Sequence, residues 1–258
     1  MAIELEGGCR VSKMDEGHPI NNGSMKIWRQ IDQTTGARAI SLRVLEFSQG
    51  VSPLIQNRAA DEVFYVLEQI DGRPRQAIRC KVHIEGRSYE VEAETGIYLK
   101  PEQTMLVENP GIIPVVVVSV QCPELNSDGK VAPVHVRPGS GMSFPGARLN
   151  DKREMPTADR WYRVLVDDEV GSKHVTQFVG SIPPGRAPDH FHEYEEVLFI
   201  LRGTGRMWAG KTTTAIGPGS CVYLPKGQVH CVENTGPDEL RLLGVFYPAG
   251  SPAVRYEV

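Results

Sequence analysis

Two short segments in the C-terminal half of the chain gather four potential metal ligands. The first segment holds His190, His192 and Glu196, and the second, residues 219–234, includes His230. Both segments are short, bounded by glycine and strand-like in composition. Because successive side chains of a β-strand point to opposite faces, the imidazoles of His190 and His192 must point the same way. The two side chains can therefore share a metal ion.

Glu196 begins a run of apolar residues that completes the donor set. The length and the β-branched, aromatic composition of residues 196–201 predict a buried strand, which ends at Gly203. A short turn at residues 193–195 would bring the Glu196 carboxylate back beside the two imidazoles. Three imidazoles and one carboxylate are a typical donor set for a transition metal. The alternative is that each histidine is an ordinary polar residue of a strand.

These two segments resemble the two sequence motifs of the cupin superfamily. In the first motif, Gly185 lies one residue too close to His190, and the other positions fit at His190, His192, Glu196 and Gly203. The second motif fits without a gap at Gly219, Pro225, Gly227, His230 and Asn234. The resemblance implies a small antiparallel barrel in which one divalent metal is held by His190, His192, Glu196 and His230.

An internal repeat extends the resemblance to the N-terminal half. Residues 61–68 resemble residues 195–202, and residues 96–101 resemble residues 219–225. The chain is therefore similar to a bicupin, an all-β protein with two tandem cupin barrels of the double-stranded β-helix, or jelly-roll, type. Frequent glycine and proline between short apolar runs also favour an all-β chain.

The metal motif is intact only in the second copy. Alignment of Glu62 with Glu196 places Gln56 and Arg58 at the positions of His190 and His192. An arginine repels a divalent cation but can pair with a carboxylate. We expect Arg58 to neutralise Glu62 where the metal would otherwise lie, and the alternative is that both side chains are solvated.

The repeat predicts three parts of the chain. Residues 1–126 would form an N-terminal barrel with a degenerate metal motif, and residues 161–258 a C-terminal barrel with the metal site. Residues 127–160 contain several Gly- and Pro-rich turns and few periodic apolar positions. This composition predicts a connecting segment between the barrels.

Charge and hydropathy exclude several other classes of protein. The net charge of -4 and the absence of a basic run argue against a nucleic-acid partner. The longest apolar stretch, residues 112–120, is interrupted by Pro114 and is too short to cross a bilayer. The first residues are acidic where a signal peptide needs a basic start. These features predict a cytoplasmic protein without a membrane segment.

Alternation along the strand of Glu196 predicts part of the lining of the site. If Glu196 faces the metal, Leu198 and Ile200 face the same cavity. The opposite face of this strand is also apolar, so the other barrel or another subunit should cover it, and a homodimer is expected. Further candidates for contact with a small-molecule substrate, for which a core role is the alternative, are Gln177, Arg206, Trp208, Tyr223 and Phe246.

The resemblance implies a metal-dependent enzyme with open coordination positions. A largely apolar pocket favours a non-haem dioxygenase that acts on a small aromatic or enolic metabolite. Iron or manganese is the favoured metal, and nickel, copper, cobalt or zinc is possible. Glu196 would then act as a catalytic residue that accepts a proton. The alternatives are a Lewis-acid isomerase, decarboxylase or lyase, and a cupin that binds a small ligand without turnover.

Overall fold

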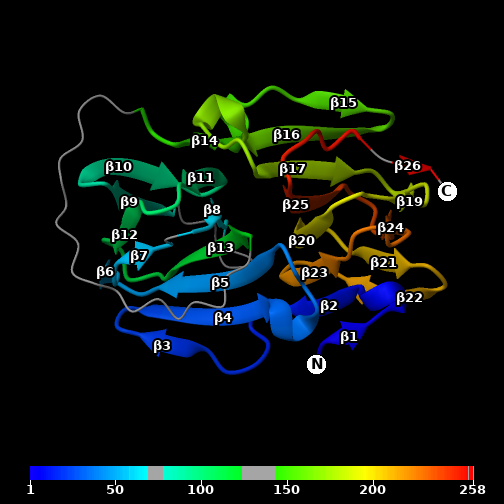
Figure 1. The fold of residues 1–258 in the computed structure, drawn as a ribbon, viewed down its shortest axis with the longest axis horizontal. Helices are drawn as coiled ribbons and strands as arrows, with labels where there is room; N and C mark the ends of the chain where they lie inside the picture. The colour runs from blue at the N-terminus through cyan, green and yellow to red at the C-terminus, as the bar shows by residue number, and fades with distance from the viewer. Residues whose placement is uncertain (58, 69–77, 124–142, 255, 258) are drawn as a thin grey trace.

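The chain folds almost entirely into antiparallel β-sheets joined by short turns (Figure 1). The computed structural model describes residues 1–258 except residues 58, 69–77, 124–142, 255 and 258. Within this described part, no helix has the length and apolar character that crossing a membrane requires.

The first barrel consists of two facing sheets with apolar side chains between them. Its larger sheet has the strand order β14 (Gly146–Arg148), β11 (Thr95–Leu99), β8 (Asp61–Val66), β13 (Val115–Cys122), β5 (Ser41–Phe47), β4 (Met25–Ile31) and β3 (Ile20–Asn22). Its smaller sheet has the order β10 (Arg87–Glu92), β9 (Arg79–Ile84), β12 (Thr104–Asn109) and β6 (Gly50–Val51), with β7 (Ile55–Gln56) also on β12.

The second barrel repeats this arrangement. Its larger sheet has the order β1 (Ile3–Glu4), β2 (Arg10–Lys13), β23 (Ser220–Leu224), β20 (Glu195–Arg202), β25 (Leu240–Tyr247), β17 (Thr176–Ile182), β16 (Arg160–Val166) and β15 (Met155–Thr157). Its smaller sheet has the order β22 (Thr212–Ile216), β21 (Gly205–Ala209), β24 (His230–Asn234), β19 (His190–Phe191) and β26 (Tyr256–Glu257), with β18 (Gly185–Arg186) also on β24. The predicted all-β architecture of two tandem barrels is confirmed.

The two large sheets pack against each other and bury a shared apolar core. Val63 and Tyr65 of β8 lie in this core together with Val197 and Phe199 of β20. The other face of β20, with Leu198 and Ile200, packs inside the second barrel. β20 is therefore buried on both faces, as predicted, and the layer that covers its outer face is the first barrel. A homodimer is not needed for this burial and stays a prediction.

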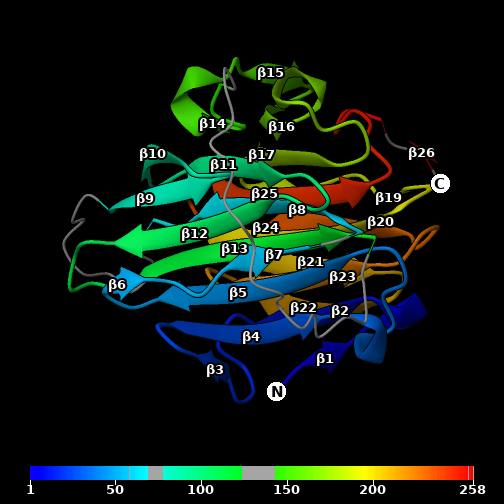
Figure 2. The same ribbon diagram turned by 60° about the vertical axis from the view of Figure 1, so that its left-hand side comes forward.

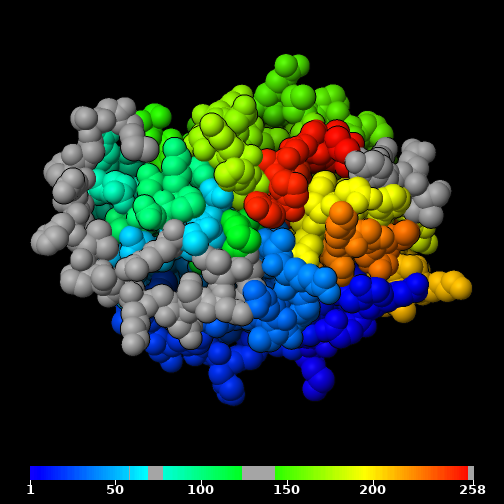
Figure 3. Space-filling model, in the orientation of Figure 1, coloured from blue at the N-terminus to red at the C-terminus, as the bar shows by residue number. Residues whose placement is uncertain are grey.

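In each barrel, one edge of the larger sheet is extended by a segment that the sequence analysis placed in another part of the chain. β2 lies in the predicted first barrel but pairs with β23 of the second, from Arg10 opposite Tyr223 to Lys13 opposite Ser220. In Figure 2 β1 and β2 lie beside β23, and in Figure 3 the blue N-terminal atoms adjoin the orange atoms of the second barrel. β14, predicted as part of the connection, pairs with β11 of the first barrel.

The predicted boundaries at residues 126 and 160 therefore do not separate the two hydrogen-bonded units. A bare sheet edge exposes unpaired N–H and C=O groups, and the added strands satisfy these groups on β23 and β11. The residues of β2 and β14 show no local sequence pattern from which their pairing with β23 and β11 could be predicted.

Candidate metal centre

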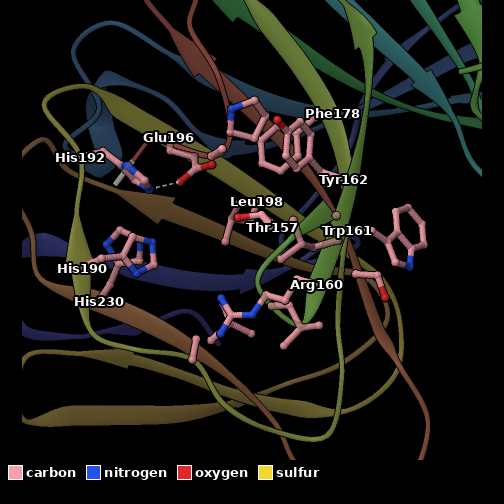
Figure 4. A pocket seen from close by; sticks show the side chains of 18 residues that line it. Thr157, Arg160, Trp161, Tyr162, Phe178, His190, His192, Glu196, Leu198 and His230 are labelled. Atoms are coloured by element: carbon pink, nitrogen blue, oxygen red, sulfur yellow. Dashed lines mark ion pairs between the residues drawn. The ribbon is translucent and has the colours of Figure 1, made fainter. Parts of the chain in front are cut away.

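Three imidazoles converge inside the second barrel (Figure 4). His190 lies on β19 and His230 begins β24, and the two residues face each other across this strand pair. His192 follows β19 after one residue. One ring nitrogen from each imidazole lies within 4.8 Å of the others. The expectation that these side chains point to one place therefore agrees with the structure.

Glu196 joins this cluster from the large sheet. It is the second residue of β20, and its Oε2 atom lies 3.4 Å from Nε2 of His192. Both side chains are buried. The structure thus brings together all four residues that the two motifs contribute.

Hydrogen bonds to the backbone orient two of the rings. Nδ1 of His230 lies 2.8 Å from the carbonyl oxygen of Gln228, and Nδ1 of His190 lies 3.1 Å from that of Pro188. A carbonyl only accepts a hydrogen bond, so it selects the tautomer with the proton on Nδ1. The Nε2 lone pair of each ring is then available to a metal, the arrangement common among metal-binding histidines.

The protonation states suit metal binding. Burial, together with the neighbouring imidazoles, lowers the pKa of His192 to about 3, and burial with His190 nearby lowers the pKa of His230 to about 4. Both rings are therefore neutral at pH 7, as metal ligation requires. Burial raises the pKa of Glu196 to about 8. A divalent cation beside this carboxyl would favour its ionised form, so the donor set fits such an ion.

A cavity of about 120 Å³ opens beside the imidazoles. Leu198 lines it, as predicted, together with the aromatic side chains of Trp161, Tyr162 and Phe178. Arg160, at the start of β16, supplies a cationic group to the lining, and Figure 4 shows its side chain on the side of His190 and His230. The cavity is small and lined by both apolar and polar side chains, and its one guanidinium, that of Arg160, lies 3.6 Å from the carboxylate of Asp159.

Two of the predicted substrate contacts point away from this cavity toward the first barrel. Gln177 is buried beside Gly96, where an added Cβ would lie 2.4 Å from Oε1 of Gln177. Its neighbour Phe178 lines the cavity, so alternation places Gln177 on the opposite face of β17. Tyr223 likewise lies in the core between the barrels, because its neighbour Leu224 is the residue that pairs with Glu196.

The other three predicted contacts also lie outside the cavity lining. Arg206 and Trp208 are on the outer face of β21, since Met207 and Ala209 are its buried residues. Nε1 of Trp208 donates a hydrogen bond to Glu233 at 2.8 Å. Phe246 packs within the core of the second barrel.

The prediction missed Arg160 and Phe178, two residues of the cavity wall. Arg160 was assigned to the connecting segment, although it begins the strand β16 that lines the cavity. Phe178 could have been found by parity, since it directly follows Gln177, the residue chosen instead. The choice between the two faces of β17 was the error.

In the first barrel, an ion pair occupies the position equivalent to the metal centre. Glu62 is fully buried, and its Oε1 atom accepts hydrogen bonds from the Arg43 guanidinium and, at 2.6 Å, from the Ser119 hydroxyl. Gln121 donates to Oε2 of Glu62 at 3.1 Å. The predicted partner, Arg58, lies outside the described residues. Among the residues that the structure describes, Arg43 of β5 is the cation that pairs with Glu62.

Arg43 holds the same place in β5 that Phe178 holds in β17, the third residue of each strand. Within the part of the chain that the structure describes, the only cluster of three or more metal-ligating side chains is the one at His190, His192 and His230.

Comparison with known proteins agrees with this geometry. Residues 178–246 match the family model of the cupin domain, a segment that holds all four motif residues of the centre. The chain contains a cupin domain. The chain also matches two curated proteins over short segments. One is auxin-binding protein 1 of Arabidopsis thaliana, 29% identical over 86 residues, which are 30% of this chain and 43% of that protein.

The other is an uncharacterized protein of Streptomyces coelicolor, 38% identical over 60 residues, which are 23% of this chain and 56% of that protein. The matches thus span about half the length of these curated relatives.

Solved structures share the fold of this chain over nearly its whole length. Protein Ylba from E. coli superposes with a TM-score of 0.73 at 10% identity, covering 98% of this chain and 96% of that one. Oxalate decarboxylase of Lactobacillus farciminis gives a TM-score of 0.71 at 12% identity, covering 96% and 87%. A variant of the Bacillus subtilis oxalate decarboxylase, an enzyme described with Mn(II) centres, gives 0.70 at 12% identity, covering 93% and 77%. The fold is that of a bicupin.

Proposed function

We propose that the protein is a metal-dependent enzyme whose second barrel acts on a small enolic or carboxylate-bearing metabolite, and that its reaction is that of a dioxygenase. The observation that carries this proposal is the convergence of His190, His192, His230 and Glu196 on the wall of a cavity. A purely structural metal site would be closed by its own ligands, whereas this donor set leaves room beside it.

The four side chains would hold the metal, and the surrounding residues would bind the substrate. When bound, the metal would supply redox or Lewis-acid chemistry to a substrate that chelates it. The guanidinium of Arg160 would pair with a substrate carboxylate. Trp161, Phe178 and Leu198 would exclude water from the reacting atoms. Glu196 would accept a proton from the substrate.

The apolar part of the lining supports the dioxygenase over the other chemistries. We expect iron- or manganese-loaded protein to consume oxygen in the presence of a small enolic acid. The Glu196→Gln variant should lose this activity because an amide cannot accept the proton. Oxygen electrode measurements over a panel of small enolic and aromatic acids test both points. Undiminished turnover in an oxygen-free chamber would overturn the dioxygenase proposal.

A Lewis-acid decarboxylase, isomerase or lyase is the second candidate, and Arg160 is the observation that favours it. A cationic group in a small cavity suits a small acid, and two of the similar structures are named oxalate decarboxylases. For this candidate, zinc or magnesium would preserve turnover and oxygen would be irrelevant.

The role of Arg160 can be tested separately from the type of chemistry. Loss of a charge-assisted hydrogen bond costs about 1.5–3 kcal/mol, so Arg160→Gln should weaken binding of an acidic substrate by roughly 10- to 100-fold. Arg206→Gln removes an arginine from the outer face of the same barrel and serves as the control. Titration of the acid into both metal-loaded variants gives the measurement. Equal affinities would show that Arg160 does not bind the carboxylate.

A further inference from the structure

A carboxylate next to the metal centre is held by the first barrel. Glu195 directly precedes Glu196 in β20, so the two side chains point to opposite faces of the strand. The carboxylate of Glu195 is buried at the junction of the barrels. Its oxygens accept hydrogen bonds from the backbone N–H of Arg38, at 3.1 Å, and of Ala39, at 2.7 Å. The Tyr223 hydroxyl adds a third donor, at 2.9 Å from Oε1.

The first barrel shapes the loop that presents these N–H groups. Asp32 caps the short helical turn Gln33–Thr35, and its side chain accepts a hydrogen bond from the backbone N–H of Thr34 at 2.9 Å. Gly36 then takes the left-handed conformation, with φ 99°, which glycine adopts without steric cost. The loop reverses there and aims the next N–H groups at Glu195. The backbone N–H groups of Arg38 and Ala39 are therefore oriented by contacts within the first barrel.

Glu195 lies inside the short segment that carries two of the four motif residues. His192 is at one end of this segment and Glu196 is at the other. Between them, the Tyr194 ring stacks on the His192 ring, with centroids 4.8 Å apart and planes at 8°. A shift of the Glu195 backbone would move Glu196 directly and His192 through Tyr194.

We propose that Glu195 is a positioning residue of the metal centre, through which the first barrel fixes Glu196 and His192 in the geometry that metal binding needs. This inference rests on the proposed metal site of the second barrel. It gives the first barrel a role in metal binding, although its own equivalent position holds the Arg43–Glu62 ion pair.

The first barrel contains a matched contact, and no metal-ligating cluster is found among its described residues. Asp61 directly precedes Glu62 in β8, as Glu195 precedes Glu196 in β20. The hydroxyl of Tyr98 donates a hydrogen bond to Oδ1 of Asp61, as Tyr223 does to Glu195. Oδ2 of Asp61 lies 3.2 Å from Nδ1 of His174, which belongs to the second barrel. Each barrel thus contacts the other through an equivalent acid, which also accepts a hydrogen bond from a tyrosine of its own barrel.

This pseudo-symmetry supplies controls that separate positioning from docking. We expect Glu195→Gln to raise the Kd for Mn²⁺ by about tenfold or more, the effect typical of residues that orient metal ligands. The amide keeps one acceptor oxygen but replaces the other by an NH2 group, which cannot accept from the backbone N–H or hydroxyl donors that both oxygens of Glu195 bind. Tyr223→Phe should raise the Kd to a smaller extent. Asp61→Asn and Tyr98→Phe should leave it unchanged, even where they lower the Tm.

Chelator competition gives the Kd of each variant, and the electron paramagnetic resonance spectrum of bound Mn²⁺ reports the ligand geometry. An unchanged Kd and spectrum in both Glu195→Gln and Tyr223→Phe would overturn the inference. Equal losses in all four variants would also overturn it, because they would reflect barrel docking alone. If Glu195→Gln does not fold, Tyr223→Phe against Tyr98→Phe decides. Failure of the wild-type protein to bind Mn²⁺ or any other divalent ion would overturn the proposed metal site itself, and this inference with it.

Discussion

At the scale of residues, the equivalent glutamates of the two barrels, Glu196 and Glu62, have different neighbours. Glu196 lies beside neutral imidazoles, whereas Glu62 is paired with a guanidinium. A single strand position accounts for part of this difference, since Arg43 of β5 corresponds to Phe178 of β17. A buried carboxylate needs either a cation or a proton. In the first barrel the protein supplies the cation itself.

Removal of that cation should destabilise the first barrel. Among the described residues, Arg43→Ala leaves buried Glu62 with the neutral donors Ser119 and Gln121, which should cost on the order of 3 kcal/mol. Urea unfolding of the variant measures the loss. Adding Glu62→Gln to Arg43→Ala should recover part of it, because the amide carries no charge. Metal content should stay as in the wild-type protein, and an unchanged unfolding midpoint in Arg43→Ala would contradict the assignment.

Glu196 should make the metal-free protein sensitive to pH. Its pKa is raised from 4.5 to about 8, so the folded state holds a proton that the unfolded state releases. The contribution of Glu196 to the free energy of unfolding is therefore fully present below about pH 4.5 and is lost as the pH rises toward 8. At pH 7 the loss is roughly 3 kcal/mol. Metal-free Glu196→Gln should lack this loss.

Urea unfolding of metal-free wild type and Glu196→Gln between pH 5 and pH 8 measures the difference between them. Bound metal should remove the pH dependence, because it stabilises the ionised carboxylate. Parallel pH profiles for the two metal-free proteins would contradict the raised pKa.

At the scale of elements, strand parity explains which site residues could be predicted. The motifs fixed the direction of Glu196, and alternation then correctly predicted that Leu198 lines the cavity. Ile200 lies on the same face of β20, but it packs in the core of the barrel and does not line the cavity. No ligand fixed the facing of β17 or β23, so Gln177 and Tyr223 were assigned to the wrong face. Pairing of β2 with β23 joins residues far apart in sequence, and no local pattern specifies such a partner.

The edge strand β2 should be required for the solubility of the second barrel. Deletion of residues 1–14 would expose the N–H and C=O groups of β23 along this edge and remove the buried side chains of Cys9 and Val11. We expect a lower Tm and self-association, measured by light scattering. A peptide of residues 1–14 added in trans should reverse part of both effects. A monodisperse deletion variant with the wild-type Tm would show that β2 is dispensable.

At the scale of the whole molecule, the two large sheets pack back to back, and only one barrel keeps a cluster of imidazoles among the described residues. The repeated strand order shows that the two barrels have the same topology. In the sequence, only two pairs of segments showed the repeat: residues 61–68 with 195–202, and residues 96–101 with 219–225. The other equivalent strands have similar positions in the fold but different residues.

The protein should therefore bind about one divalent ion per chain. Elemental analysis of the purified protein measures this ratio. His190→Ala combined with His230→Ala should abolish binding, since two ligands cannot replace four. Arg206→Gln, on the outer face of the barrel, is the control. Two ions per chain, or full occupancy in the double variant, would contradict a single centre in the second barrel.

The pairing of β2 with β23 also has a consequence for the order of events during synthesis. Lys13 contacts Ser220, 207 residues further along the chain. At a translation rate of about 5–20 residues per second, β2 leaves the ribosome roughly 10–40 seconds before its partner strand exists. β2 is thus made long before the strand β23 with which it pairs. The nascent chain must carry β2 without this partner while the first barrel forms, and the large sheet of the second barrel is completed only when β23 has been made.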